Sequence, residues 1–144
     1  MAPYWVTVAK SADNLNSAQT QVETLRDQVV PKLMARSSHD QRLCLEVKHK
    51  VLSAEMKLRA SLAREETRGL HYRADFPYRD DENFLCYITV QKDADGNMTT
   101  GKVDIKDEWK GDLTADYTDR YTYYFPGERD ALGLPEEEES SGWG

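Results

Sequence analysis

Apolar residues near the start of the chain recur at alternating steps of three and four, and this spacing predicts a helix. The stripe consists of Leu15, Ala18, Val22, Leu25, Val29 and Leu33, which repeat as in a heptad seam. Ser11 or Asp13 can cap the start of this helix. Pro31 interrupts the pattern because proline has no amide hydrogen, so a kink or an end is expected near Val30.

A second helical segment follows, and it carries two apolar stripes. The first stripe is Leu43, Val47, Val51, Ala54, Leu58 and Leu62, and the second is Leu45, Leu52, Met56 and Ala63. Asp40 can start this helix, which is expected to run without a break over residues 43–66 and to close at Gly69. Since one preceding helix can cover only one stripe, the other is expected to meet a third element or a partner.

Alternating apolar and polar residues from Phe84 to Ile105 predict a β-hairpin with its turn at residues 93–97, Asp-Ala-Asp-Gly-Asn. We therefore expect a mainly α fold. A long antiparallel, spectrin-repeat-like helical hairpin from about Ala12 to Arg68 precedes the β-hairpin, and an irregular acidic tail follows it. The expected boundaries are a lead-in over 1–10, a helical domain over 11–134 and a disordered tail over 135–144.

An aromatic cluster follows Asp107 and comprises Tyr117, Tyr121, Tyr123, Tyr124 and Phe125. It can wrap over the helices or form a contact strip for a partner, and the sequence leaves both possibilities open. The same region is acidic, with eleven acidic residues against three basic ones from Asp107 onward, in a chain of net charge -7. Acidity of this kind argues against nucleic acid as a partner.

With 144 residues, the chain is long enough to bury a core as one domain. It contains no apolar stretch long enough for a secretory signal or a membrane span, so we expect a cytoplasmic protein with no direct membrane insertion. Cys44 and Cys86 are expected to be unpaired, and neither they nor the scattered histidines have the spacing of a metal site.

Five of the ten arginines fall between positions 59 and 79, close to several carboxylates. Arginine in place of lysine favours planar, bidentate contacts. One interpretation is a structural network that ties the end of the second helix to the next segment. The other is a docking surface for another domain or a phosphorylated cofactor.

The same stretch resembles a family signature. Residues 66–73 read E-T-R-G-L-H-Y-R, 75–77 read D-F-P and 79–85 read R-D-D-E-N-F-L. This string is similar to the C-terminal domain of succinate dehydrogenase and fumarate reductase flavoproteins, whose usual form is E-S-R-G-A-H-x-R-x-D-F-P-x-R-D-D-x-N-W-L, and to the related L-aspartate oxidases. The chain departs from that form at Thr67, Leu70 and Phe84.

The resemblance implies a FAD-dependent oxidoreductase in which this chain packs on a preceding FAD-binding domain and helps to contact an iron-sulfur subunit. It implies a cytoplasmic position at the membrane face, held through partner subunits. The residues it assigns to domain docking are Arg64, Glu66, Arg68, Gly69, His71, Arg73, Asp75, Arg79, Asp80, Asp81 and Asn83. His71 can serve either in packing against the flavin domain or as a structural histidine.

No glycine-rich G-x-G-x-x-G turn, which would present backbone amides to a diphosphate, occurs in the sequence. The chain alone is therefore expected to contain no catalytic residue, to bind no cofactor and to convert neither succinate nor fumarate. The alternative hypothesis is a stand-alone helical interaction module without redox activity. A flavin domain encoded immediately upstream would distinguish the two.

Overall fold

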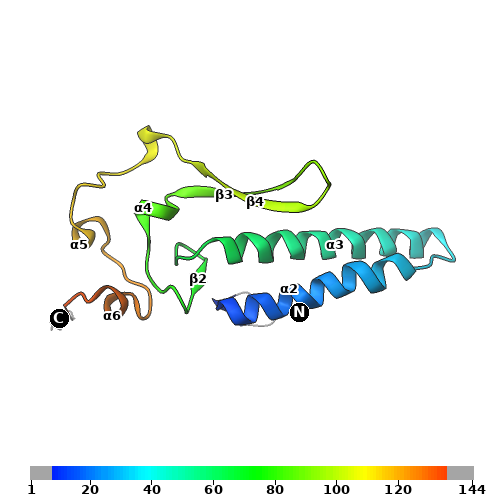
Figure 1. Ribbon diagram of the computed structural model, residues 1–144. Coiled ribbons are helices and arrows are strands. Elements are labelled where there is room, and N and C mark those ends of the chain that lie inside the picture. The colour runs from blue at the N-terminus through cyan, green and yellow to red at the C-terminus, as the bar shows by residue number, and fades with distance from the viewer. Residues whose placement is uncertain (1–7, 136–144) are drawn as a thin grey trace.

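The computed structural model describes residues 8–135, of which about half are helical. Two helices, α2 (Ala12–Thr24) and α3 (Ser38–Ala63), lie side by side and run antiparallel (Figure 1). A β-hairpin of β3 (Cys86–Lys92) and β4 (Met98–Asp104) lies along α3 on the side away from α2. Helix α3 is thus the middle layer, and the predicted helical pair followed by a hairpin is confirmed. The finer likeness to a spectrin repeat stays a prediction.

Short elements gather at the end of the pair where α3 finishes (Figure 1). There β1 (Ala9–Lys10) pairs in parallel with β2 (Tyr72–Arg73). The remaining short helices are α4 (Asp81–Phe84), the 3-10 helix η3 (Asp107–Trp109), α5 (Tyr117–Arg120) and α6 (Glu128–Leu132).

The first helix begins and ends as its local sequence predicts. The side chain of Ser11 caps α2 by accepting a hydrogen bond from the amide of Asn14. Before Pro31 the helix widens into a π turn, η1 (Leu25–Val29), in which the Val30 amide donates to the Leu25 carbonyl. A 3-10 turn, η2 (Val30–Lys32), then ends the helix. π turns are a frequent cause of kinks in helices.

The prediction of one continuous helix over 43–66, closed at Gly69, is wrong at its C-terminal end. Helix α3 starts after the Ser37 cap and stops at Ala63, and Arg64 is already extended (φ -98°, ψ 102°). Gly69 (φ 58°) lies instead in a tight turn, where the amides of Arg68 and His71 each donate to the other's carbonyl. Glycine at the first central position with positive φ is typical of a type II′ turn.

The predicted hairpin is confirmed, with Phe84 belonging to α4 rather than to the strand. The pairing runs from Cys86↔Asp104 to Lys92↔Met98. Asp93 organises the turn, because its side chain accepts from the amides of Asp95 and Asn97.

The interior of the described residues is ionic rather than apolar. Only Leu15, Leu58 and Phe84 are buried apolar side chains in that part of the chain. The buried polar side chains are Lys10, Glu55, Ser61, Glu66, Thr67, Arg73 and Glu128. Charged residues are almost never fully buried without partners, and each of these charged residues except Lys10 forms an ion pair within the described residues.

The second apolar stripe of α3 stays largely open. Leu45 and Leu52 are each 48 % exposed and Met56 is 40 % exposed, although the hairpin lies beside the last two. The hairpin is thus the third element that the two stripes predicted, and it leaves apolar surface uncovered. The predicted lead-in and acidic tail lie outside the described residues except for residues 8–10 and Pro135.

Candidate functional site

Arg73 joins the end of α3 to the start of α2. Its side chain is 1 % exposed, and Nη1 donates to the last carbonyls of the helix, those of Ser61 (2.9 Å), Leu62 (3.4 Å) and Arg64 (3.0 Å). Nε and Nη2 donate to the two oxygens of Asp75, both at 2.7 Å. Asp75 Oδ2 also accepts from the amide of Ala12, the first residue of α2, at 2.8 Å. A cation at a helix C-terminus and a carboxylate at an N-terminus both complement the helix dipoles.

Thr67, which stands where the family signature has serine, keeps the hydrogen bonds that a serine hydroxyl could make. Its hydroxyl accepts from the Arg73 amide (2.9 Å) and donates to the Phe76 carbonyl (2.8 Å), and the residue is fully buried. Serine and threonine both provide this hydroxyl, so the substitution retains the contact.

Glu66 is the buried anion at the centre of the motif. Its carboxylate accepts from Arg64, from Arg68 Nε (2.9 Å) and Nη2 (2.8 Å), and from the Asp80 amide (2.9 Å). Four donors on one carboxylate satisfy its charge without water. The predicted site residues Arg64, Glu66, Arg68 and Asp80 are therefore brought together.

Asp81 extends the network toward the C-terminal segment. It accepts from Arg68 Nη2 (2.6 Å), from Arg120 and from the Tyr121 hydroxyl (2.8 and 2.7 Å). Burial alone would raise the pKa of Asp81, but the hydrogen bonds from Tyr121 and Arg68 hold it below its ordinary value. Arg68 thus bridges Glu66 and Asp81.

Arg79 pairs with a residue far along the chain. Its Nη1 lies 2.9 and 3.0 Å from the two oxygens of Glu128, which is fully buried and also accepts from Tyr117. The guanidinium of Arg79 lies 4.2 Å from the ring centroid of Tyr121, within the range of a cation–π contact. Burial and the Glu128 carboxylate raise the pKa of Tyr117.

Arg64 ties the motif to the β-hairpin. It donates to the carbonyls of Phe84 (2.9 Å) and Cys86 (2.5 Å). The Phe84 ring, which stands where the family has tryptophan, lies with its centroid 3.6 Å from Lys102 Nζ. An aromatic face next to a cation is retained by either ring.

Two further predicted residues have local roles. Asn83 donates to the side chain of Asp80, which caps α4. Gly69 lies in the exposed turn, where a side chain added at its position would meet no atom within 4 Å apart from its chain neighbours. Tyr117, Arg120, Tyr121 and Glu128 were not predicted as site residues. For Tyr117 and Tyr121 the aromatic cluster was the available signal, but it did not distinguish wrapping from partner contact, and Arg120 and Glu128 lie outside that cluster.

His71 is held neutral at the end of α3. Its Nε2 lies 3.3 Å from the Arg64 carbonyl, which requires a proton on that nitrogen. Burial, together with the positive charges of Lys10, Arg73 and Arg64, lowers the pKa of His71 from 6.5 to about 4.

We expect His71 to make the chain sensitive to mild acid. Below its unfolded pKa the unfolded chain takes up a proton that the folded chain excludes, so stability is lost as the pH falls from about 6.5 to about 4. His71→Gln can still donate to the Arg64 carbonyl and should lose less stability over this range in urea unfolding. His49→Gln, on the exposed surface of α3, is the control. Parallel pH profiles for the protein and the His71 variant would contradict the assignment.

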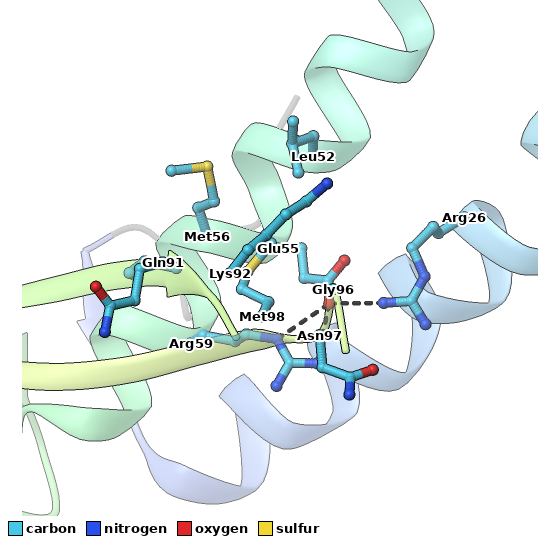
Figure 2. Close-up of a pocket in the computed structure, with 11 residues that line it drawn as sticks. Arg26, Leu52, Glu55, Met56, Arg59, Gln91, Lys92, Gly96, Asn97 and Met98 are labelled. Carbon is cyan, nitrogen blue, oxygen red and sulfur yellow. Dashed lines mark hydrogen bonds and ion pairs between the residues drawn. The ribbon is translucent and has the colours of Figure 1, made fainter. Parts of the chain in front are cut away.

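A pocket of 610 Å³ lies between α3, η1 and the tip of the hairpin, away from the motif (Figure 2). Buried Glu55 forms its wall and accepts from Arg26 (2.7 Å) and Arg59 (2.9 Å). Its apolar lining is Leu52, Met56, Val90 and Met98. Glu55 is already paired with Arg26 and Arg59, so it is not free to bind a ligand. The pocket is therefore interpreted as an extension of the open apolar surface of α3.

Within residues 8–135, no group of three or more His, Cys, Asp or Glu side chains could hold a metal ion. Cys44 and Cys86 are free thiols. No helix in the described part of the chain is long and apolar enough to cross a membrane.

Residues 3–121 match the family model of the fumarate reductase flavoprotein C-terminal domain. The chain belongs to this family. The family comprises C-terminal domains of succinate dehydrogenase and fumarate reductase flavoproteins, so the resemblance carried by residues 66–85 is confirmed.

Individual relatives agree with this assignment. The chain is 50 % identical over 42 residues to the fumarate reductase flavoprotein subunit of Mycobacterium tuberculosis, covering 29 % of this chain and 7 % of that protein. It is 46 % identical over 43 residues to the 8-methylmenaquinol:fumarate reductase flavoprotein subunit of Wolinella succinogenes, covering 30 % of this chain and 7 % of that protein.

A solved structure of the FrdA chain of E. coli quinol fumarate reductase matches with a TM-score of 0.62 and 25 % identity, over 68 % of this chain and 18 % of that one. The chain thus spans less than a fifth of the length of each of these three relatives.

Proposed function

We propose that this chain is the C-terminal helical domain of a FAD-dependent oxidoreductase of the succinate and fumarate type, and that it packs on the flavin domain without being catalytic alone. The observation that carries the proposal is the open apolar stripe on α3, next to an interior with only three buried apolar side chains in the described residues. A domain that buries little and exposes much apolar surface is suited to a permanent contact.

The geometry of the stripe supports a single extended contact. Leu45, Leu52 and Met56 lie seven and four residues apart, so they share one face of α3. Burying one leucine side chain typically stabilises by about 1.5–3 kcal/mol, so covering this face would contribute several such increments. The pocket beside Leu52 and Met56 gives the same face a depression that an apolar side chain of the flavin domain can fill (Figure 2).

The motif contributes rigidity to a different part of the domain, the segment that follows the C-terminal end of α3. Arg64, Arg68, Arg73 and Arg79 each pair with carboxylates of this chain. We infer that they fix the shape of the end that meets the flavin domain. Direct docking by the predicted motif residues, and the domain boundaries at 11–134, stay predictions.

In the parent protein the preceding domain would bind FAD, and an iron-sulfur subunit would be a further partner. Two relatives are named as flavoprotein subunits of fumarate reductases, which supports this arrangement. Held through such partners, the domain would lie in the cytoplasm at the membrane face. The stand-alone interaction module is the second candidate, because the open apolar stripe of α3 could also contact an unrelated partner.

The proposal is tested with Leu45→Glu and Leu52→Glu combined in the full flavoprotein. We expect lower flavin content per polypeptide and a lower melting temperature, because two charges would face the flavin domain. In the 144-residue chain alone the same pair should change the free energy of unfolding by less than about 0.5 kcal/mol per site, since these side chains are half exposed there.

Met34→Glu is the matched control, because Met34 is 85 % exposed and lies outside α3. Unchanged flavin content in the leucine variant would argue for the interaction module.

A further inference from the structure

Lys10 is a buried cation without a partner in the part of the chain that the structure describes. The residue is 3 % exposed, yet no carboxylate or carbonyl among residues 8–135 accepts a hydrogen bond from its ammonium group. Lysine is almost never buried to this extent unless it is paired. Every other buried charged side chain in that part of the chain has at least one ion pair.

The groups around Lys10 are mostly cations, and the nearby carboxylate is already bonded to other residues. In the β1–β2 pair Lys10 lies opposite Arg73, so two cations are neighbours across the strands. The carboxylate beside them, Asp75, is already occupied by Arg73 and by the Ala12 amide. Burial first, and then the charges of Lys57 and Arg73, lower the pKa of Lys10. His71, also nearby, is neutral and bonded to the Arg64 carbonyl.

The ammonium of Lys10 is nevertheless accessible to an incoming group. Within the described residues, Arg120 Nε is the one side-chain polar atom that is both sealed from solvent and unpaired. Lys10 Nζ has no partner within residues 8–135 either, but it is not fully sealed from solvent.

We propose that Lys10 receives a carboxylate side chain of the flavin domain, an inference that rests on the proposed function. A carboxylate fits better than a phosphate, because Lys10 is the one unsatisfied donor here, whereas phosphates are held by several amides or guanidinium groups. We take the flavin domain as the source of this carboxylate because the matched family model describes the C-terminal part of these flavoproteins. This chain covers only 18 % of the E. coli relative, so most of such a protein lies outside the matched part. In that arrangement, the lead-in strand that carries Lys10 would be the part of this chain closest in sequence to the preceding domain.

The test compares Lys10→Met with Lys57→Met, which removes the same charge from an exposed position on α3. In the full flavoprotein we expect Lys10→Met, and not Lys57→Met, to lower the temperature at which flavin is released. With the flavin domain supplied as a separate polypeptide, Lys10→Met should weaken its binding to this chain by roughly thirtyfold or more, as for loss of one partner of a buried pair.

In the chain alone, Lys10→Met should melt at the same or a higher temperature, because it removes a buried charge that has no partner there. This measurement separates lost docking from misfolding. If Lys10→Met melts well below Lys57→Met in the chain alone, the ammonium is satisfied internally and the inference is overturned.

Two further results would overturn it. One is equal binding of the flavin domain by the two lysine variants, with the unaltered chain still binding, which leaves the proposed function intact. The other is a Lys10-dependent rise in melting temperature with sodium phosphate or sodium succinate, against sodium chloride at equal ionic strength, which would assign a free anion. If the unaltered chain does not bind the flavin domain, the proposed function fails as well.

Discussion

Arg73→Met is expected to destabilise the chain by about 3–5 kcal/mol, the cost of breaking a buried ion pair by removing one partner. The variant leaves Asp75 without its bidentate partner and removes the Arg73 donor from the carbonyls of Ser61 and Leu62, while the Arg64 carbonyl keeps only its contact with His71. Methionine fills much of the volume but donates no hydrogen bond. The lost stability therefore comes from the contacts that join the start of α2 to the end of α3.

Urea unfolding followed by circular dichroism measures this loss. Arg42→Met is the matched control, because Arg42 forms only a long, exposed pair with Glu46 at 3.8 Å, and such pairs contribute about 0–1 kcal/mol. A double-mutant cycle with Asp75→Asn should show strong coupling with Arg73. Equal midpoints for the Arg73 and Arg42 variants would mean that the contacts of Arg73 contribute nothing to stability.

The elements with regular patterns could be predicted from the sequence. The stripes on α2 and α3, the break at Pro31 and the hairpin around Asp93 all reflect local periodicity or turn chemistry, and the structure contains each of them. Local signals are sufficient there because each element is determined by its own residues.

The end of α3 could not be predicted in the same way. Residues 62–68, L-A-R-E-E-T-R, are mostly good helix formers, and Gly69 supplies a plausible stop. The helix ends earlier because Arg73 donates hydrogen bonds to its last carbonyls. In addition, the buried Glu66 carboxylate accepts hydrogen bonds from Arg64 and Arg68. Tertiary bonds to residues further along the chain override the local preference.

The candidate site was predicted in part. The signature identified the arginines and carboxylates, but their pairing depends on distant residues. Arg79 meets Glu128, 49 positions away, and Asp81 meets Tyr121, 40 positions away. Nothing in the spacing of charges indicates such pairs, and nothing in the lead-in indicates that Lys10 is buried.

Glu128→Gln is expected to cost about 3 kcal/mol, the low end for breaking a buried pair, because glutamine keeps the shape and one acceptor oxygen. Glu128 accepts from Arg79, Tyr117 and the Phe125 amide (2.7 Å), so losing its charge leaves the Arg79 guanidinium buried without a carboxylate. The pKa of Tyr117 should also fall toward its ordinary value, because Glu128 is one of the two causes that raise it. Tyrosinate absorbance in an alkaline titration reports this directly.

The same substitution separates the C-terminal segment from the rest of the fold. Glu128 lies beyond residues 3–121, the part that matches the family model, yet it neutralises a motif arginine. Hydrogen exchange should therefore speed up over residues 117–132 while α2 and α3 keep their protection. Glu108→Gln, at an exposed 3.4 Å pair with Lys106, is the control and should change neither the melting temperature nor the exchange. Uniformly faster exchange across α3 would instead show that Glu128 supports the helical pair itself, and unchanged exchange would show that Arg79 finds another partner.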